Sequence, residues 1–107
     1  MAERTYESIE FAPGSTHTIP AGDIVNVISG ANSTIDGAII ASDTPGSPAY
    51  LNFLDGTIIV ADCTFTDIDA SGGGLIDATD GGTDGGGNTN IIFTLAAAWF
   101  FFFQDDK

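Results

Sequence analysis

Residues 56–65 of the chain are GTIIVADCTF, and residues 67–73 are DIDASGG. Apolar side chains alternate at Ile58 and Val60, and Cys63 and Phe65 continue the alternation after the Ala61-Asp62 pair. A period of two is typical of a strand with one buried face, and β-branched residues favour strands. Short strands of this kind, separated by Gly and Asp, predict an all-β fold.

The rest of the chain repeats this pattern. We expect strands near Ile9–Phe11, His17–Ile19, Ile24–Ile28, Ile39–Ala41, Ala49–Phe53, Ile58–Ala61, Cys63–Phe65, Leu75–Asp77 and Ile91–Phe93. Ile9, Ile24 and Ile39 are 15 residues apart, and weak repetition at a fixed period indicates stacked coils. The sequence therefore favours a short parallel β-helix (β-solenoid), with a small β-sandwich as the alternative because it also uses evenly spaced short strands.

Four segments resemble a right-handed parallel β-helix module found in phage tail and surface proteins and in bacterial surface proteins. They are Ser42–Ala49, Gly56–Val60 leading to Cys63, Asp67–Gly73 and Asp84–Phe93. The family often has Gly-Trp where this chain has Asn90-Ile91, so the closing turn differs. The resemblance covers about half of the chain and implies a right-handed β-helix in a virion protein. It implies no catalytic motif.

The C-terminal segment differs from everything before it. We predict that residues 1–94 form the solenoid domain and that residues 95–107 form an aromatic tail. Five consecutive aromatic residues stand in this tail: Trp99, Phe100, Phe101, Phe102 and Phe103. Strand side chains alternate between two faces, so five neighbours cannot all enter one core. We expect these five residues to form an interface between chains, and the alternative is a cap over the end of their own solenoid.

Charge limits the partners. The 107 residues carry a formal net charge of −13, and Arg4 and Lys107 are the only basic residues besides one histidine. Nucleic acid and anionic membrane surfaces need basic patches, so neither is an expected partner. No apolar signal region opens the sequence, and the run Ile91–Phe103 is shorter than the ~20 residues of a membrane span. We therefore expect synthesis in a host cytoplasm without a signal peptide.

Candidate catalytic and metal-binding groups are few. Six aspartates offer carboxylates for a glycosidase-like pair: Asp62, Asp67, Asp69, Asp77, Asp80 and Asp84. We expect them to be solvated turn residues. The Gly/Asp loop at 79–90 does not match a calcium-binding EF-hand loop. His17 is the only histidine, which excludes a His-based metal site within one subunit, and we expect it at an exposed strand position.

Cys63 is the only cysteine, so it has no intrachain disulfide partner, and its apolar neighbours predict a buried thiol. No nucleotide-binding P-loop is present. These observations predict a protein that is not an enzyme and that uses no cofactor and no metal.

The function that we expect is that of a non-enzymatic structural protein on the surface of a phage virion. Within that class we favour a capsid decoration protein (cement or head fibre) that forms a homotrimer and binds a shell or tail protein. A tail fibre, or a receptor-binding tip that contacts a host glycan, is the alternative. A polysaccharide depolymerase is the least favoured function.

Overall fold

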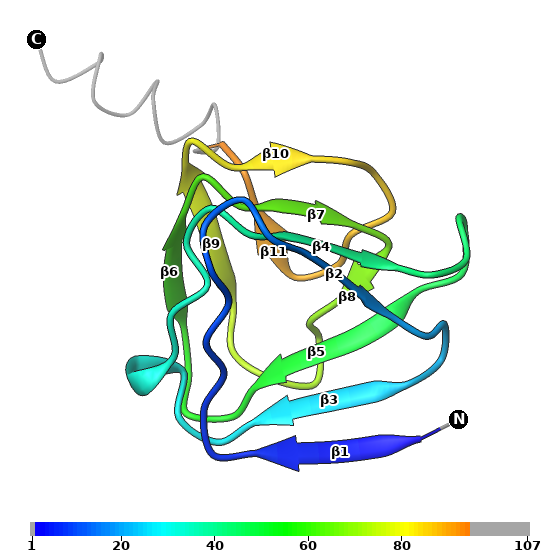
Figure 1. Cartoon of the computed structure of the whole chain (residues 1–107), viewed down its shortest axis with the longest axis horizontal. Helices are drawn as coiled ribbons and strands as arrows, with labels where there is room; N and C mark the ends of the chain where they lie inside the picture. The colour runs from blue at the N-terminus through cyan, green and yellow to red at the C-terminus, as the bar shows by residue number, and fades with distance from the viewer. Residues whose placement is uncertain (1, 95–107) are drawn as a thin grey trace, which may run out of the picture.

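The computed structural model describes residues 2–94, which form a parallel β-solenoid of about four turns (Figure 1). The first sheet holds β1 (Glu3–Tyr6), β3 (Ile24–Val27), β5 (Ala49–Phe53) and β8 (Ile68–Asp69), in that order. The second sheet holds β2 (Thr16–Ile19), β4 (Ile39–Ser42), β7 (Thr64–Thr66) and β10 (Thr83–Asp84). The third sheet holds β6 (Ile58–Ala61), β9 (Ile76–Asp80) and β11 (Ile91–Ile92). The 3-10 helix η1 (Gly30–Asn32) lies in the second coil.

Every strand pair in residues 2–94 is parallel, so each coil lies on the one before it. The predicted solenoid is therefore confirmed. The sandwich alternative is wrong because sandwiches are built from antiparallel sheets.

The 15-residue repeat does not describe the coil. In the first sheet the register partners Glu3, Ile24, Tyr50 and Asp69 are separated by 21, 26 and 19 residues. Ile24 and Ile39 lie in different sheets, on β3 and β4. Between these two strands the chain also crosses the third side of the solenoid, where Glu10 bridges Thr34. The 15-residue interval therefore spans two faces and is not the length of one coil.

Left-handed backbone corners connect the faces. Between the third and second sheets, Gly14, Gly37, Asp62 and Gly81 have φ values of 81°, 80°, 58° and 74°. The Gly14 N–H donates to the Gly37 carbonyl at 2.9 Å, and the Asp62 N–H donates to the Asp80 carbonyl at 2.8 Å. Glycine adopts positive φ without steric cost, and aspartate tolerates it better than most residues. These residue types therefore set where each coil turns.

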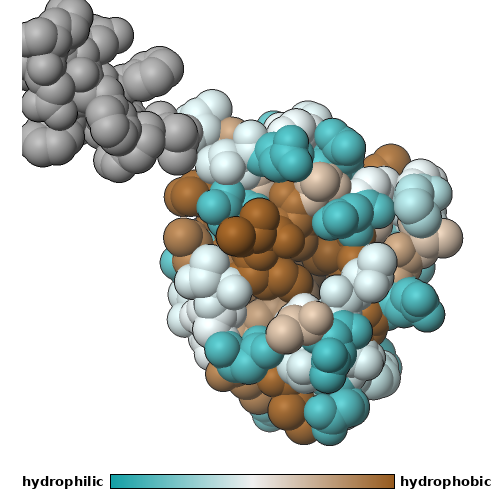
Figure 2. Space-filling view, turned by 90° about the vertical axis from the view of Figure 1, so that its left-hand side faces the viewer, coloured by the Kyte–Doolittle hydropathy of each residue, from teal (hydrophilic) through white to brown (hydrophobic). Residues whose placement is uncertain are grey.

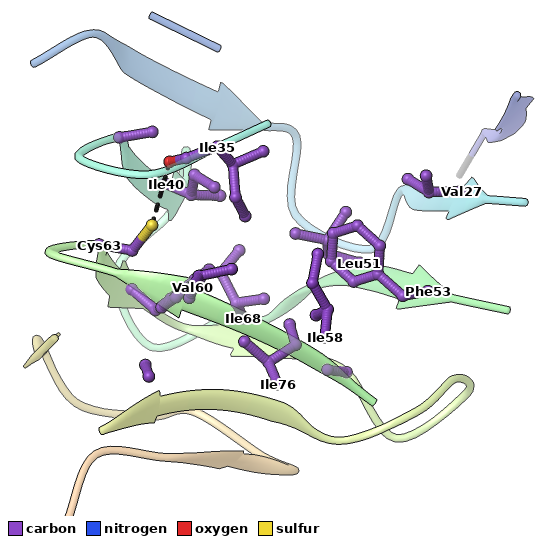
Figure 3. Close-up of a cluster of buried hydrophobic side chains, with 14 of the residues drawn as sticks. Val27, Ile35, Ile40, Leu51, Phe53, Ile58, Val60, Cys63, Ile68 and Ile76 are labelled. Carbon is purple, nitrogen blue, oxygen red and sulfur yellow. Dashed lines mark hydrogen bonds between the residues drawn. The ribbon is translucent and has the colours of Figure 1, made fainter. Parts of the chain in front are cut away.

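The core is a column of apolar side chains inside the coils (Figure 3). Val27, Phe53 and Phe65 are fully buried, and Ile40 and Ile68 join them from the second and first sheets. Cys63 is also fully buried, which confirms its prediction, and its thiol donates to the Ile35 carbonyl at 3.1 Å (Figure 3). Burial raises the pKa of the Cys63 thiol, because a thiolate would lose its hydration there.

Candidate interaction surfaces

Aspartate side chains of one coil accept hydrogen bonds from the backbone of a neighbouring coil, and we call these contacts braces. Five of them accept a hydrogen bond at 2.9 Å from a backbone N–H 21 to 25 residues away. The pairs are Asp23 with Ala2, Asp43 with Ala21, Asp55 with Gly30, Asp36 with Ala61 and Asp67 with Gly46. Charge-assisted bonds of this kind satisfy donors that the strand ladders leave unpaired at the corners. Much of the acidity of the chain therefore serves the construction of the solenoid.

Asp55 is the clearest of these braces. Its two carboxylate oxygens accept from the Gly30 N–H at 2.9 Å and the Ala31 N–H at 3.2 Å, at the start of η1. These two backbone hydrogen bonds hold the pKa of Asp55 below its ordinary value. The exposed carboxylate thus joins the corner after β5 to the coil below.

A polar ladder runs across the first sheet. The Asn52 amide donates to the Asn26 side-chain oxygen at 3.1 Å, and the Asn26 amide donates to the Glu3 carboxylate at 2.8 Å. The Gly72 N–H donates to the Asn52 side-chain oxygen at 3.1 Å. Asn26 and Asn52 are buried, so each bond satisfies a polar group that water does not reach.

In residues 2–94, no group of three or more Asp, Glu, His or Cys side chains is placed to hold a metal ion, and this holds for the six candidate carboxylates as well. Asp69, Asp77 and Asp84 accept hydrogen bonds from the N–H groups of Ser71, Thr79 and Gly86, two residues further along the chain. Asp67 braces Gly46, as described above. Asp62 has a left-handed backbone, and Asp80 is exposed.

The expected turn position is wrong for Asp69, Asp77 and Asp84, which lie on β8, β9 and β10. Each of these three, like Asp67, accepts a backbone hydrogen bond. The Gly/Asp loop at 79–90 is likewise attached to the solenoid. Its Asn88 accepts from the Ile68 N–H at 3.0 Å and donates to the Phe65 carbonyl at 2.8 Å.

His17 is not at an exposed position. It is half-buried, its ring stacks on Phe11 with a centroid distance of 3.6 Å, and Nε2 lies 2.8 Å from the Ser15 hydroxyl. Its register partner is the buried Ile40, and Ile40 pairs in turn with Phe65. Register partners project from the same face of a parallel sheet, so His17 faces inward at the start of the core column. The alternation from Thr16 to Ile19 was compatible with either face.

A polar groove lies on the side of the solenoid that carries η1 and β6. It has a volume of ≈ 420 Å³ and is lined mainly by residues 30–36 and 57–60, with Asp36 and Asp55 at its edges. Figure 2 views this side and shows apolar residues gathered at the centre of the face with polar residues around them. Both carboxylates at its edges already accept backbone hydrogen bonds, and Ile59 beside it is 74% exposed.

The end of the solenoid at β1 is apolar and open. A cavity of ≈ 270 Å³ there is lined by the following residues: Tyr6, Ile9, Glu10, Phe11, His17, Thr18, Ile19, Val25 and Leu51. We call this surface the β1 end. Tyr6 is the first member of a register column that continues with Val27 and Phe53, and its exposed fraction is 43% where theirs is zero. This surface was not predicted from the sequence, because the segment Glu3–Tyr6 lacks apolar alternation.

The predicted interface residues Trp99 to Phe103 lie outside the described residues, so that prediction stays open. Within the described part of the chain, no helix is long and apolar enough to cross a membrane. No protein-family model matches the chain, and no match is found among curated proteins or solved structures. The assignment to a β-solenoid therefore stands on the strand register alone.

Proposed function

We propose that this chain is a non-enzymatic structural protein that assembles with other chains, and that its role is decoration of a phage capsid. The observation that carries the proposal is a division within residues 2–94. Side chains capable of chemistry hold backbone groups together, whereas the β1 end presents apolar side chains to solvent. A contiguous apolar surface on an otherwise polar protein marks an interaction site.

The hydrogen bonds that aspartates accept between coils support a structural role. Catalytic carboxylates work as pairs whose oxygens are free to meet a substrate. Asp36, Asp55 and Asp67 instead accept hydrogen bonds from neighbouring coils. A solenoid whose coils are joined in this way presents a strongly acidic surface. Such a surface is suited to face solvent or a basic patch on a shell.

The virion context rests on the sequence resemblance to β-helix modules of phage proteins. We favour decoration over a tail fibre because about four coils form a compact unit with little surface for a long glycan. A homotrimer, with the aromatic tail between subunits, agrees with the apolar β1 end.

The test is mass spectrometry of particles purified from a culture that carries the gene in its native genome. A decoration protein is present in a fixed ratio to the major shell protein, and deletion of its gene leaves intact but less stable particles. Absence of the chain from purified particles would contradict the proposal. A ratio of only a few copies per particle would favour a tail location instead.

The non-enzymatic part has its own test. We expect no release of reducing ends when the purified chain is incubated with capsular and cell-wall polysaccharides. Release that disappears in the double variant Asp67→Asn with Asp69→Asn would overturn this part and support a depolymerase.

A further inference from the structure

We propose that the β1 end of one chain binds the aromatic segment Trp99–Phe103 of a second copy. The inference goes beyond the virion role and holds or fails independently of it. The observations that carry it are the chemistry of the cavity and the position of Thr94 in the solenoid.

The cavity matches an aromatic guest. Its inner wall consists of Ile9, Phe11, Ile19 and Val25, all partly buried against the core, and Leu51 forms its floor. Tyr6 stands at the rim with an exposed fraction of 43%. Apolar pockets of this kind bind rings by removing apolar area from water, at about 25 cal/mol per Å². Aromatic residues are the preferred anchors at the centres of interfaces.

The geometry favours a second chain over the same chain. Thr94 follows β11, which lies beyond β9 and β6 at the opposite end of the solenoid from β1 (Figure 1). On the side of the third sheet, the successive coils carry Glu10, Thr34, β6, β9 and β11. The four spacings between them, at about 4.8 Å each, amount to roughly 19 Å. Trp99 is five residues after Thr94 and reaches at most about 18 Å when fully extended. Its own chain therefore leaves no length for Trp99 to turn into the cavity, whereas Phe103, nine residues after Thr94, spans up to about 32 Å and can reach it. The comparison of lengths thus assigns Trp99 itself to the cavity of a second chain.

Charge contributes little to this docking. Arg4 lies on β1 in register with Val25, so it belongs to the column that forms the cavity wall, and Glu10 lines the cavity itself. The aromatic run is followed by Asp105, Asp106 and Lys107. Arg4 is the only basic residue in residues 2–94 apart from His17, and Glu3, Glu7 and Glu10 belong to the same segment, so an acidic guest gains at most this one opposite charge.

The experiment uses the fluorescence of Trp99, the single tryptophan of the chain. Emission of the full-length protein is recorded during dilution from micromolar to nanomolar concentration. We expect blue-shifted emission at high concentration and a red shift on dilution, as the segment leaves the cavity of its neighbour. Tyr6→Asp and Ile19→Asp place a charge in the apolar wall and raise the midpoint concentration by at least about ten-fold. Arg4→Glu raises it by about two- to five-fold.

The matched control is Ile59→Asp. It introduces the same charge at an exposed isoleucine on β6, away from the β1 end, and leaves the midpoint unchanged. Protection of the buried Cys63 thiol from alkylation checks that each variant is folded. Blue emission that persists at every dilution would mean that the tail folds onto its own chain and would overturn the proposal. Red emission throughout, or equal effects of Tyr6→Asp and Ile59→Asp, would also overturn it.

Discussion

The first and third coils use the same pairing but have different surroundings. β1 pairs with β3 over four residues in register, and β3 pairs with β5 in the same way. Yet all four residues of β1 are exposed, whereas four of the five residues of β5 are buried. Hydrogen-bonded pairing therefore does not bury a strand in this molecule. Burial comes from a coil on the other side, which the first coil lacks within the described residues.

This comparison separates the packed coils, which we call the wall, from the exposed β1 end. The wall combines a packed core, the polar ladder and the aspartate braces. The β1 end keeps the inward positions but fills them with Arg4, Tyr6 and His17, whose polar tips tolerate water and also suit an interface. Substitutions that weaken either the wall or the β1 end test this difference.

The largest loss of stability is expected from a substitution in the register column of the first sheet that contains Tyr6 and Phe53. Phe53 is fully buried, and Phe53→Ala should lower the free energy of unfolding by about 3–5 kcal/mol through lost burial and a cavity. Tyr6 belongs to the same column, but Tyr6→Ala should cost about 1 kcal/mol or less in a monomer, because its side chain is 43% exposed. Urea unfolding measured at low protein concentration gives both values. Equal losses would refute the distinction between wall and end.

A smaller loss of stability is expected from a substitution at Gly73, where a loop packs closely against β5. A Cβ atom at Gly73 would lie 2.6 Å from the Phe53 backbone nitrogen and 2.7 Å from its carbonyl oxygen. Gly73→Ala should therefore cost about 2–3 kcal/mol, since the backbone of β5 cannot move away. Gly46→Ala is the control, because its Cβ meets open space and the cost is the strain of φ +84°, about 1–2 kcal/mol. A smaller loss at Gly73 than at Gly46 in urea unfolding would contradict the tight contact.

The polar ladder offers a third test. Asn52→Ala removes the amide that donates to Asn26 and the oxygen that accepts from Gly72. Buried partners left unsatisfied cost about 1–3 kcal/mol, and we expect a loss in that range in urea unfolding. Asn32→Ala, at an exposed position in η1, should change stability by less than about 0.5 kcal/mol. A neutral Asn52→Ala variant would show that water replaces the ladder.

The smallest effect concerns pH. The pKa of Asp55 is lower in the folded chain than its ordinary value of 3.8, so this carboxylate stabilises the fold above that pH. The stabilisation is lost as the pH falls through 3.8 toward the folded pKa. Asp55→Asn should therefore narrow the difference between the urea midpoints at pH 6 and pH 3. Asp80→Asn, at the exposed last residue of β9, should leave that difference closer to the wild-type value. Identical pH profiles for wild type and Asp55→Asn would exclude the brace.

The sequence predicted most of the wall. The strands Ala49–Phe53 and Ile58–Ala61 have the bounds that apolar alternation indicated. β8 and β10 have two residues each, too few for a pattern, and exist because a neighbouring strand pairs with them. β1 was missed for the same reason, since Glu3–Tyr6 becomes a strand only beside β3.

Features that depend on coil length could not be predicted. The coil lengths vary between 15 and 26 residues among the strand pairs, so no single period exists in the sequence. The braces follow from those lengths, because Asp36 meets Ala61 only when 25 residues separate them. A usable signal was present at the corners, where Asp-Gly and Gly pairs recur. The orientation of His17 had no such signal. His17 and Ile19 share one face of the strand and two threonines share the other, and neither set marks the buried face.

The most direct test of the account is the mass of the full-length protein in solution by light scattering. We expect association at micromolar concentration. A closed ring of three chains, each giving its tail to the next, has three times the 11.0 kDa chain mass, about 33 kDa. Ile19→Asp should return the protein to 11.0 kDa, and Ile59→Asp should leave the assembly intact. A monomer at every concentration would contradict the claim that the β1 end binds a second chain.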